Sequence, residues 1–271
     1  MKTIIVATDF SPASFNASAY AADMANAIKA DLLLFHVYNA PVIYAEIPVV
    51  VNPPEPPEES VKKMNELKRR LSSRISSEVI IQAEIMKGDF YHELDKLCGR
   101  IMPYAVVMGS QGSTGAKRFF LGSNAVYTAK HLPWPVITVP PDVSFTSIKK
   151  IGLACDFENV VDTIPVDEIN RLVKDFQASL HILNTGKGKE FKPEMIQESA
   201  FLQEMILTLE PTYHFIRHEN TDEGIMDFAE ENHIDLLLVI PKRHGMINSL
   251  LNRSHSKQLV LHSHIPVMAI H

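Results

Sequence analysis

The chain has 271 residues, of which 46% are hydrophobic and 21% charged, and its formal net charge is −6. This composition predicts a packed globular protein of one large or two ordinary domains and excludes a disordered chain. The negative charge argues against a general nucleic-acid binder, and no apolar run approaches the length of a membrane span.

The opening stretch, "MKTIIVATDF", is typical of a first strand rather than a signal peptide, because Asp9 interrupts its short apolar run. The two cysteines, Cys98 and Cys155, lie in apolar surroundings. We therefore expect buried thiols in a reducing compartment and a cytoplasmic protein.

In the first half of the chain, short apolar runs alternate with amphipathic stretches. Ser11 is a good N-cap residue, and Pro12 suits the first position of a helix. The expected strands are "IIVAT", "DLLLFHV", "VIIQAEIM", "YAVVM" and "PVITV", and the expected helices begin after Ser11 and cover 58–76, about 90–100 and 123–132. Such an alternation predicts an α/β fold, a doubly wound five-stranded parallel sheet with helices on both faces.

The segment 38–60 interrupts this pattern with six prolines, which favour extended and turn conformations. Two interpretations stay open. The segment is a long surface loop, or it is a lid or an arm that reaches a ligand or a partner.

The second half repeats the first. "KTIIVATDF" returns as "KKIGLACDF", which pairs Asp9 with Asp156, and "HLPWPVITV" returns as "HSHIPVMAI". We therefore predict two tandem domains, residues 1–141 and 148–271. The fifth strand of each copy is an apolar sheet edge that needs cover. We expect these two edges to pair with each other and to form an internal pseudo-dimer; a homodimer of whole chains stays open.

A glycine-rich stretch, "GSQGSTGAKRFFLGS", follows the fourth strand. Gly109, Gly112 and Gly122 are spaced G-x2-G-x9-G, and Ser123 comes directly after them at the start of a helix. Glycines allow close approach to the backbone, and a helix N-terminus offers unpaired N–H donors, so this pattern is typical of a phosphate cradle. The spacing matches neither the dinucleotide-binding GxGxxG nor the P-loop GxxxxGK[ST].

This glycine spacing, together with "IIVATDFSPAS", "LLLFHV" and "PWPVITVP", resembles the universal stress protein family over residues 1–141 and more weakly over 148–271. The resemblance implies the strand order 3-2-1-4-5, an adenine-nucleotide alpha-hydrolase-like fold. It also implies an adenine nucleotide, ATP or ADP or AMP, with Mg²⁺ or Mn²⁺ as an accompanying cation.

The resemblance places adenine near Asp9 and Val37 and ribose near Gly109. It places the phosphates against Gly112, Gly122, Ser123 and Asn124, although the family often has Val at position 124. Ala7, Thr8 and Met108 complete the expected contacts. No catalytic residue is expected. Because His262, His264 and His271 come without carboxylates or cysteines, no metal site is expected there either.

The second copy lacks the glycines, since Ile240, Arg243 and Arg253 stand at the positions of Gly109, Gly112 and Gly122. We therefore expect one nucleotide per chain, in the first domain only, and a role as a nucleotide-dependent stress sensor. Two alternatives stay open: a slow ATPase or nucleotidyl-transfer enzyme, and a scaffold in which neither site is occupied.

Overall fold

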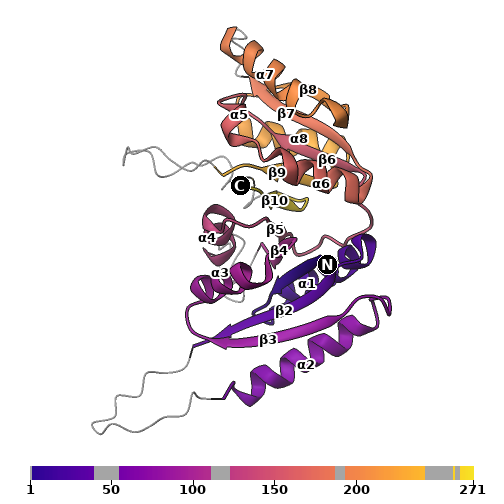
Figure 1. Cartoon of the computed structure of the whole chain (residues 1–271), viewed down its shortest axis with the longest axis vertical. Helices are drawn as coiled ribbons and strands as arrows, with labels where there is room; N and C mark the ends of the chain where they lie inside the picture. The colour runs from indigo at the N-terminus through magenta and orange to yellow at the C-terminus, as the bar shows by residue number, and fades with distance from the viewer. Residues whose placement is uncertain (1, 40–54, 111–122, 187–192, 242–258, 260–262) are drawn as a thin grey trace, which may run out of the picture.

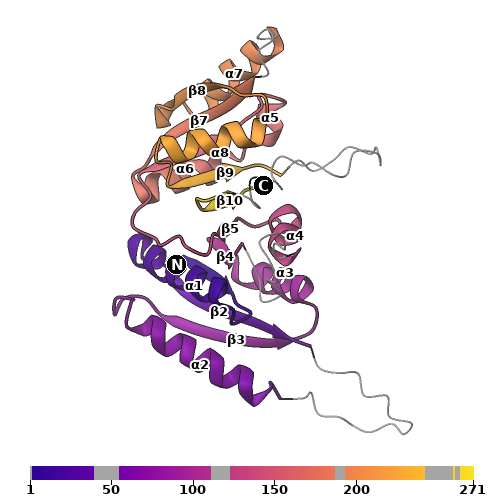
Figure 2. The same cartoon turned by 180° about the vertical axis from the view of Figure 1, so that it is seen from behind.

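A computed structural model describes residues 2–39, 55–110, 123–186, 193–241, 259 and 263–271. Figure 1 shows two α/β blocks stacked along the long axis of the molecule, one from each half of the chain, and Figure 2 shows them from behind. Each block begins with a buried strand and alternates strands with helices, as the hydrophobic pattern predicts.

The first block follows the predicted order. Its elements are β1 (Thr3–Ala7), α1 (Pro12–Ile28), β2 (Asp31–Tyr38), α2 (Glu58–Ser72), β3 (Ile81–Lys87), α3 (Phe90–Ile101), β4 (Ala105–Gly109), α4 (Ser123–His131) and β5 (Val136–Val139). The cap of α1 is the expected one, because the Ser11 side chain accepts a hydrogen bond from the Ser14 backbone N–H and Pro12 opens the helix.

The second block repeats this order with one difference. Its elements are β6 (Lys150–Ala154), α5 (Val160–Thr163), α6 (Val166–Phe176), β7 (Ser179–Gly186), α7 (Pro193–Met205), the 3₁₀ turn η1 (Leu207–Leu209), β8 (Thr212–Arg217), α8 (Thr221–Glu231), β9 (Leu236–Val239) and β10 (Val267–Ala269). Two short helices, α5 and α6, replace the single helix α1. The break falls at Pro165, where a proline cannot continue the helical hydrogen bonding.

All ten strands form one sheet in the order β3-β2-β1-β4-β5-β10-β9-β6-β7-β8. Each block therefore has the order 3-2-1-4-5 in its own strands, which confirms the predicted fold class. The two fifth strands, β5 and β10, pair antiparallel, with Val267 opposite Thr138 and Ala269 opposite Val136. The expected joining of the two apolar edges is thus present, and each edge covers the other.

Helices cover both faces of the sheet, and each face has its own apolar core that continues through both blocks. One core draws its helical side chains from α1, α2, α6 and α7. The other draws them from α3, α4 and α8. Cys98 lies in the second core and Cys155 in the first, and both are free, buried thiols as expected. Burial, with a smaller contribution from Asp95, raises the pKa of Cys98 to about 12.

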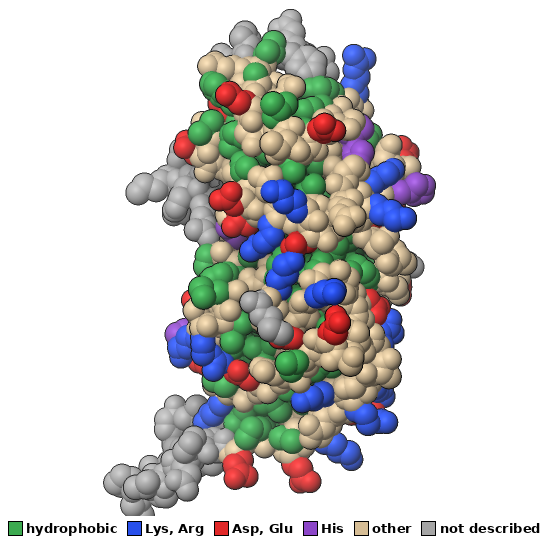
Figure 3. All heavy atoms as spheres, turned by 45° about the vertical axis from the view of Figure 1, so that its right-hand side comes forward, with side chains coloured by type: hydrophobic (Ala, Val, Ile, Leu, Met, Phe, Trp, Pro, Cys, Tyr) green, Lys and Arg blue, Asp and Glu red, His purple; other side chains and the backbone are tan. Residues whose placement is uncertain are grey.

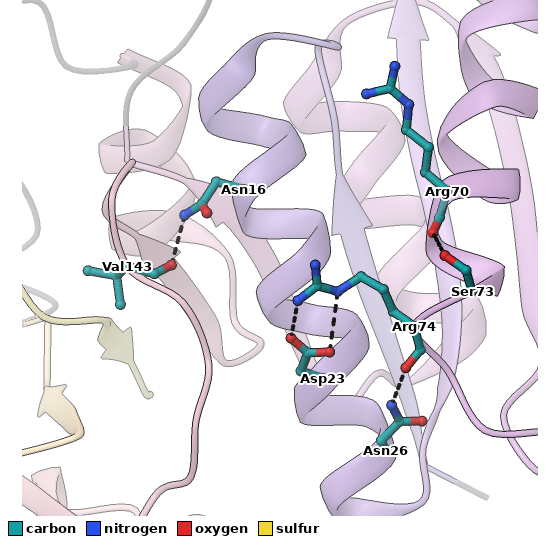
Figure 4. A network of polar contacts seen from close by, with 7 residues as sticks. All are labelled: Asn16, Asp23, Asn26, Arg70, Ser73, Arg74 and Val143. Carbon is teal, nitrogen blue, oxygen red and sulfur yellow. Dashed lines mark hydrogen bonds and ion pairs between the residues drawn. The ribbon is translucent and has the colours of Figure 1, made fainter.

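Helix α1 also anchors the chain around it (Figure 4). The Asn16 side-chain amide donates hydrogen bonds to the carbonyls of Pro140 and Val143, in the segment that connects the two blocks. Farther along the helix, Asp23 forms an ion pair with Arg74 at 2.7 Å. These contacts fix α1 between the end of α2 and the connection to the second block.

The surface has no strongly charged field on the side that Figure 3 shows, where acidic and basic side chains are interspersed. Among the described residues, no helix combines the length and the apolar character that crossing a membrane requires.

Candidate functional site

The candidate site lies at the carboxyl ends of β1 and β4. These strands are neighbours in the sheet, with Val6 opposite Val107. Ala7, the last residue of β1, therefore lies beside Met108, and β4 ends one residue later at Gly109. In the sheet, β1 has β2 on one side and β4 on the other, and the chain reaches β2 from β1 through α1. The strand order reverses at this point, which is where doubly wound sheets bind ligands.

The turn from β1 to α1 is held by side chains that accept backbone hydrogen bonds. The Thr8 hydroxyl accepts from the N–H of Phe10 at 3.0 Å, and Asp9 Oδ1 accepts from the N–H of Ser11 at 2.9 Å. Phe10 itself is left-handed, with φ of 60°. The carboxylate of Asp9 therefore belongs to a fixed turn, and its residue is exposed at the edge of the sheet.

The backbone of Thr8 is satisfied on both sides. Its N–H donates to the carbonyl of Phe35 on β2 at 2.9 Å. Its carbonyl lies 2.8 Å from Nδ1 of His36, and because a carbonyl only accepts, Nδ1 is the protonated nitrogen of that ring. The Phe10 and His36 rings lie 4.3 Å apart, so His36 contacts the turn on both sides of Asp9.

Three of the expected contact residues share one face of the sheet. Ala7 and Met108 are buried in the core beneath α3 and α4, and Val37 packs against that same core. Helix α4 begins on this face at Ser123, and the next residue, Asn124, is exposed. Positions on β1, β2 and β4 that the family resemblance singles out thus lie on the face of the sheet that α4 covers.

Gly109 has a packing role that does not involve a ligand. A Cβ added there would lie 3.0 Å from both the carbonyl carbon and the oxygen of Ala13 in α1. The backbones of α1 and β4 therefore approach so closely that a side chain at this position would push the α1 backbone away by a few tenths of an ångström. The presence of Gly109 is explained by this contact alone.

The remainder of the glycine loop is not placed. Gly112, Gly122, Lys117 and Arg118 lie outside the described residues, as does most of the proline-rich segment 38–60. The phosphate cradle thus stays a prediction from the sequence.

The second block has the same turn at the same place. Cys155 Sγ accepts from the N–H of Phe157 at 3.4 Å, and Asp156 Oδ1 accepts from the N–H of Glu158 at 3.2 Å. Phe157 is left-handed, with φ of 54°. The N–H of Cys155 donates to Leu183, and the Asn184 amide donates to the Cys155 carbonyl at 2.8 Å. Each hydrogen bond matches one in the first block.

The pairing register also fixes the other equivalences. Ile4 lies opposite Ala105 in the first block, and Ile151 lies opposite Leu236 in the second, which makes Ile240 the counterpart of Gly109. Ile240 packs against the core on the α1 and α6 side. Thr185 is the counterpart of Val37, whereas Arg243, Arg253 and Ser254 lie outside the described residues.

Phe10 and His36 complete the turn. The sequence left His36 open as a packed core histidine or a ligand contact, and it assigned no role to Phe10. The sequence could have indicated a hydrogen-bond donor at position 36. The repeat aligns His36 with Asn184, and both side chains can donate a hydrogen bond. A polar residue in the same place of two otherwise apolar strands indicates a specific acceptor. The left-handed conformation of Phe10 had no such signal, since glycine or asparagine is the usual choice there.

Within the described part of the chain, no group of three or more His, Cys, Asp or Glu side chains is arranged to hold a metal ion. Of the three C-terminal histidines, His262 is outside that part.

Comparisons with known proteins agree with this architecture. A universal stress protein from Archaeoglobus fulgidus is 17% identical, covers 99% of this chain and 97% of its own, and superposes with a TM-score of 0.70. A functionally unknown protein from Pseudomonas aeruginosa is 12% identical over 100% of this chain and 92% of its own, with a TM-score of 0.66. At these identities the likeness shows the fold alone.

A shorter universal stress protein, solved in complex with cAMP, covers 51% of this chain and 96% of its own at 21% identity, with a TM-score of 0.39 that carries no argument for this chain. No curated protein sequence matches the chain. The model of the universal stress protein family matches residues 1–140 and 184–271. Since that match extends over both repeats and most of the sequence, the chain belongs to the universal stress protein family.

Proposed function

We propose that this protein binds one adenine nucleotide, ATP or ADP or AMP, at the carboxyl edge of β1 and β4 and acts as a nucleotide-dependent sensor or regulator in the stress response. The observation that carries the proposal is the convergence at this edge. An exposed carboxylate in a fixed turn, Asp9, follows β1, and Ala7 and Met108 form an apolar surface beside it. Helix α4 packs on that same face of the sheet.

The arrangement suits the parts of such a ligand. An apolar floor supports a base, and a helix N-terminus favours phosphate oxygens. Ser123, at the start of α4, follows the glycine loop directly. Mg²⁺ or Mn²⁺ would accompany a triphosphate and offset its charge.

A binding role is favoured over turnover. Hydrolysis needs a base or a residue that positions the attacking water. The loop sequence from Gly109 to Ser123 offers Ser, Thr, Gln, Lys and Arg side chains but no carboxylate or histidine that could act as a base. Single-turnover measurements test this directly. Release of ADP faster than about 1 per second, an ordinary enzymatic rate, would instead identify an enzyme.

Calorimetric titration with ATP, ADP and AMP, each with and without Mg²⁺, tests the binding itself. cAMP is a useful fourth ligand, because a shorter family member has been solved with it. We expect Asp9→Asn to weaken nucleotide binding about tenfold or more, because it removes the charge from the proposed hydrogen bond to the nucleotide. The asparagine Oδ1 can still accept the hydrogen bond from the Ser11 N–H.

Asp156→Asn is the matched control, because Asp156 accepts the equivalent backbone hydrogen bond in the second block. It should leave the Kd unchanged. Failure of the wild-type protein to bind any of the four nucleotides would overturn the proposal, and so would an equal loss of affinity in the two variants.

A further inference from the structure

We propose that His36 is a positioning residue for the nucleotide site, because it holds the β1–α1 turn in the conformation that presents Asp9. The effect that we expect on nucleotide binding rests on the proposed function. Its structural part, the dependence of the turn on a donor at position 36, stands on the geometry alone.

The first step is the carbonyl of Thr8. The last backbone hydrogen bond between β1 and β2 is donated by the Thr8 N–H to Phe35. Thr8 is buried, so its carbonyl needs a donor once the strand pairing has ended. His36 Nδ1 supplies that donor at 2.8 Å, from the strand that lies alongside. His36 therefore ties the start of the turn to β2.

The second step is the strain at Phe10. A left-handed conformation is unfavourable for a residue with a side chain and persists when its surroundings hold it. Phe10 packs against the apolar core on the α1 side, its N–H donates to the Thr8 hydroxyl, and its ring lies 4.3 Å from the His36 ring. His36 thus contacts the residues directly before and after Asp9.

The third step is the internal control in the second block. There the donor to the equivalent carbonyl is Asn184, also at 2.8 Å, and Phe157 takes the same left-handed conformation. Phe157 packs on Tyr213 and Phe215 instead of on a histidine. The feature that the two blocks share is therefore the hydrogen-bond donor, which indicates that the donor is what the turn requires.

The test compares three variants by amide hydrogen exchange and by ATP titration. His36→Leu removes the donor, whereas His36→Asn copies the second block. Asn184→Leu removes the matching donor there. Thermal melts establish that each variant is folded.

We expect His36→Leu to speed amide exchange at Phe10 and Ser11 about tenfold and to raise the Kd for ATP by a similar factor, as the loss of one hydrogen bond predicts. His36→Asn should resemble the wild type in both measurements. Asn184→Leu should speed exchange at Phe157 and Glu158 and leave ATP binding unchanged.

Unchanged exchange at Phe10 and Ser11 in His36→Leu would overturn the positioning role, whether or not the protein binds ATP. Faster exchange without a change in Kd would overturn its link to the nucleotide site. A loss in His36→Asn equal to that in His36→Leu would contradict the donor argument. Absence of ATP binding by the wild type, by contrast, would remove the proposed function and leave the exchange measurement to decide the role in the turn.

Discussion

The two blocks of this protein share one turn and then diverge. Asp9 and Asp156 accept the same backbone hydrogen bond, and each is followed by a left-handed phenylalanine. After the turn, α1 runs unbroken from Pro12 to Ile28, whereas the second block has the four-residue α5 and then α6. The Asp turn therefore belongs to the fold of both blocks, and an aspartate there does not by itself indicate a ligand.

The counterparts Gly109 and Ile240 extend this comparison. Gly109 lies where the backbone of α1 comes close to β4, and Ile240 lies where the equivalent helix is short and broken. The loss of this glycine in the second block thus has a packing explanation. The argument for a single nucleotide site rests more heavily on the positions of Gly112 and Gly122, which become arginines in the second block.

Substitution at Gly109 should give the largest effect on stability, and Ile240 provides the matched position in the second block. Gly109→Val places side-chain atoms against the Ala13 backbone, which cannot move without shifting α1. Overpacking of this kind costs about 1–3 kcal/mol in the free energy of unfolding. Urea denaturation measures it. Ile240→Val, the matched change, should cost less, about 0.5 kcal/mol, because Ile240 is only partly buried. Equal stability of Gly109→Val and the wild type would refute the packing explanation.

A smaller contrast concerns pH. In the second block, His181 Nδ1 lies 2.9 Å from His214 Nε2, and the rings stack at 5.2 Å. Burial lowers the pKa of His181 below its ordinary value of 6.5, helped by His214 and Lys150, and burial also lowers the pKa of His214. In the first block the corresponding positions are Leu33 and Glu84, and Glu84 pairs with Arg100.

The sign of the pH effect follows from these lowered pKa values. Well above a pH of about 6.5 the histidines are neutral in both the folded and the unfolded state, so they add no pH dependence. Below it the unfolded chain binds protons more readily, and the free energy of unfolding falls. The double variant His181→Gln, His214→Gln should flatten this fall between pH 7 and 5. An unchanged slope would show that the pair does not titrate as described.

Much of the fold could be predicted from the sequence, because hydrophobic periodicity and the repeat act locally. The five strands of the first block, the Ser11 cap and the pairing of the two fifth strands follow from those signals. The break between α5 and α6 was not predicted, although Pro165 marked it. The domain bounds 1–141 and 148–271 stay a prediction.

The candidate site was less accessible to sequence reasoning. The family resemblance singles out Asp9, Ala7 and Met108, and the register of β1 and β4 brings their neighbourhoods together at one edge of the sheet. Their contact with a ligand stays a prediction. The packing role of Gly109 depends on the distance between two backbones that are far apart in sequence, and the role of His36 depends on a tertiary hydrogen bond. Neither shows in the hydrophobic periodicity, and only the alignment of His36 with Asn184 in the repeat marked position 36.

The central claim is that one block binds a nucleotide and the other, with the same turn, does not. The most direct measurement is the number of adenine nucleotides bound per chain at saturation, by equilibrium dialysis or native mass spectrometry. The account predicts one, lost in Asp9→Ala and retained in Asp156→Ala. Two nucleotides per chain, or one that is lost only in Asp156→Ala, would contradict it.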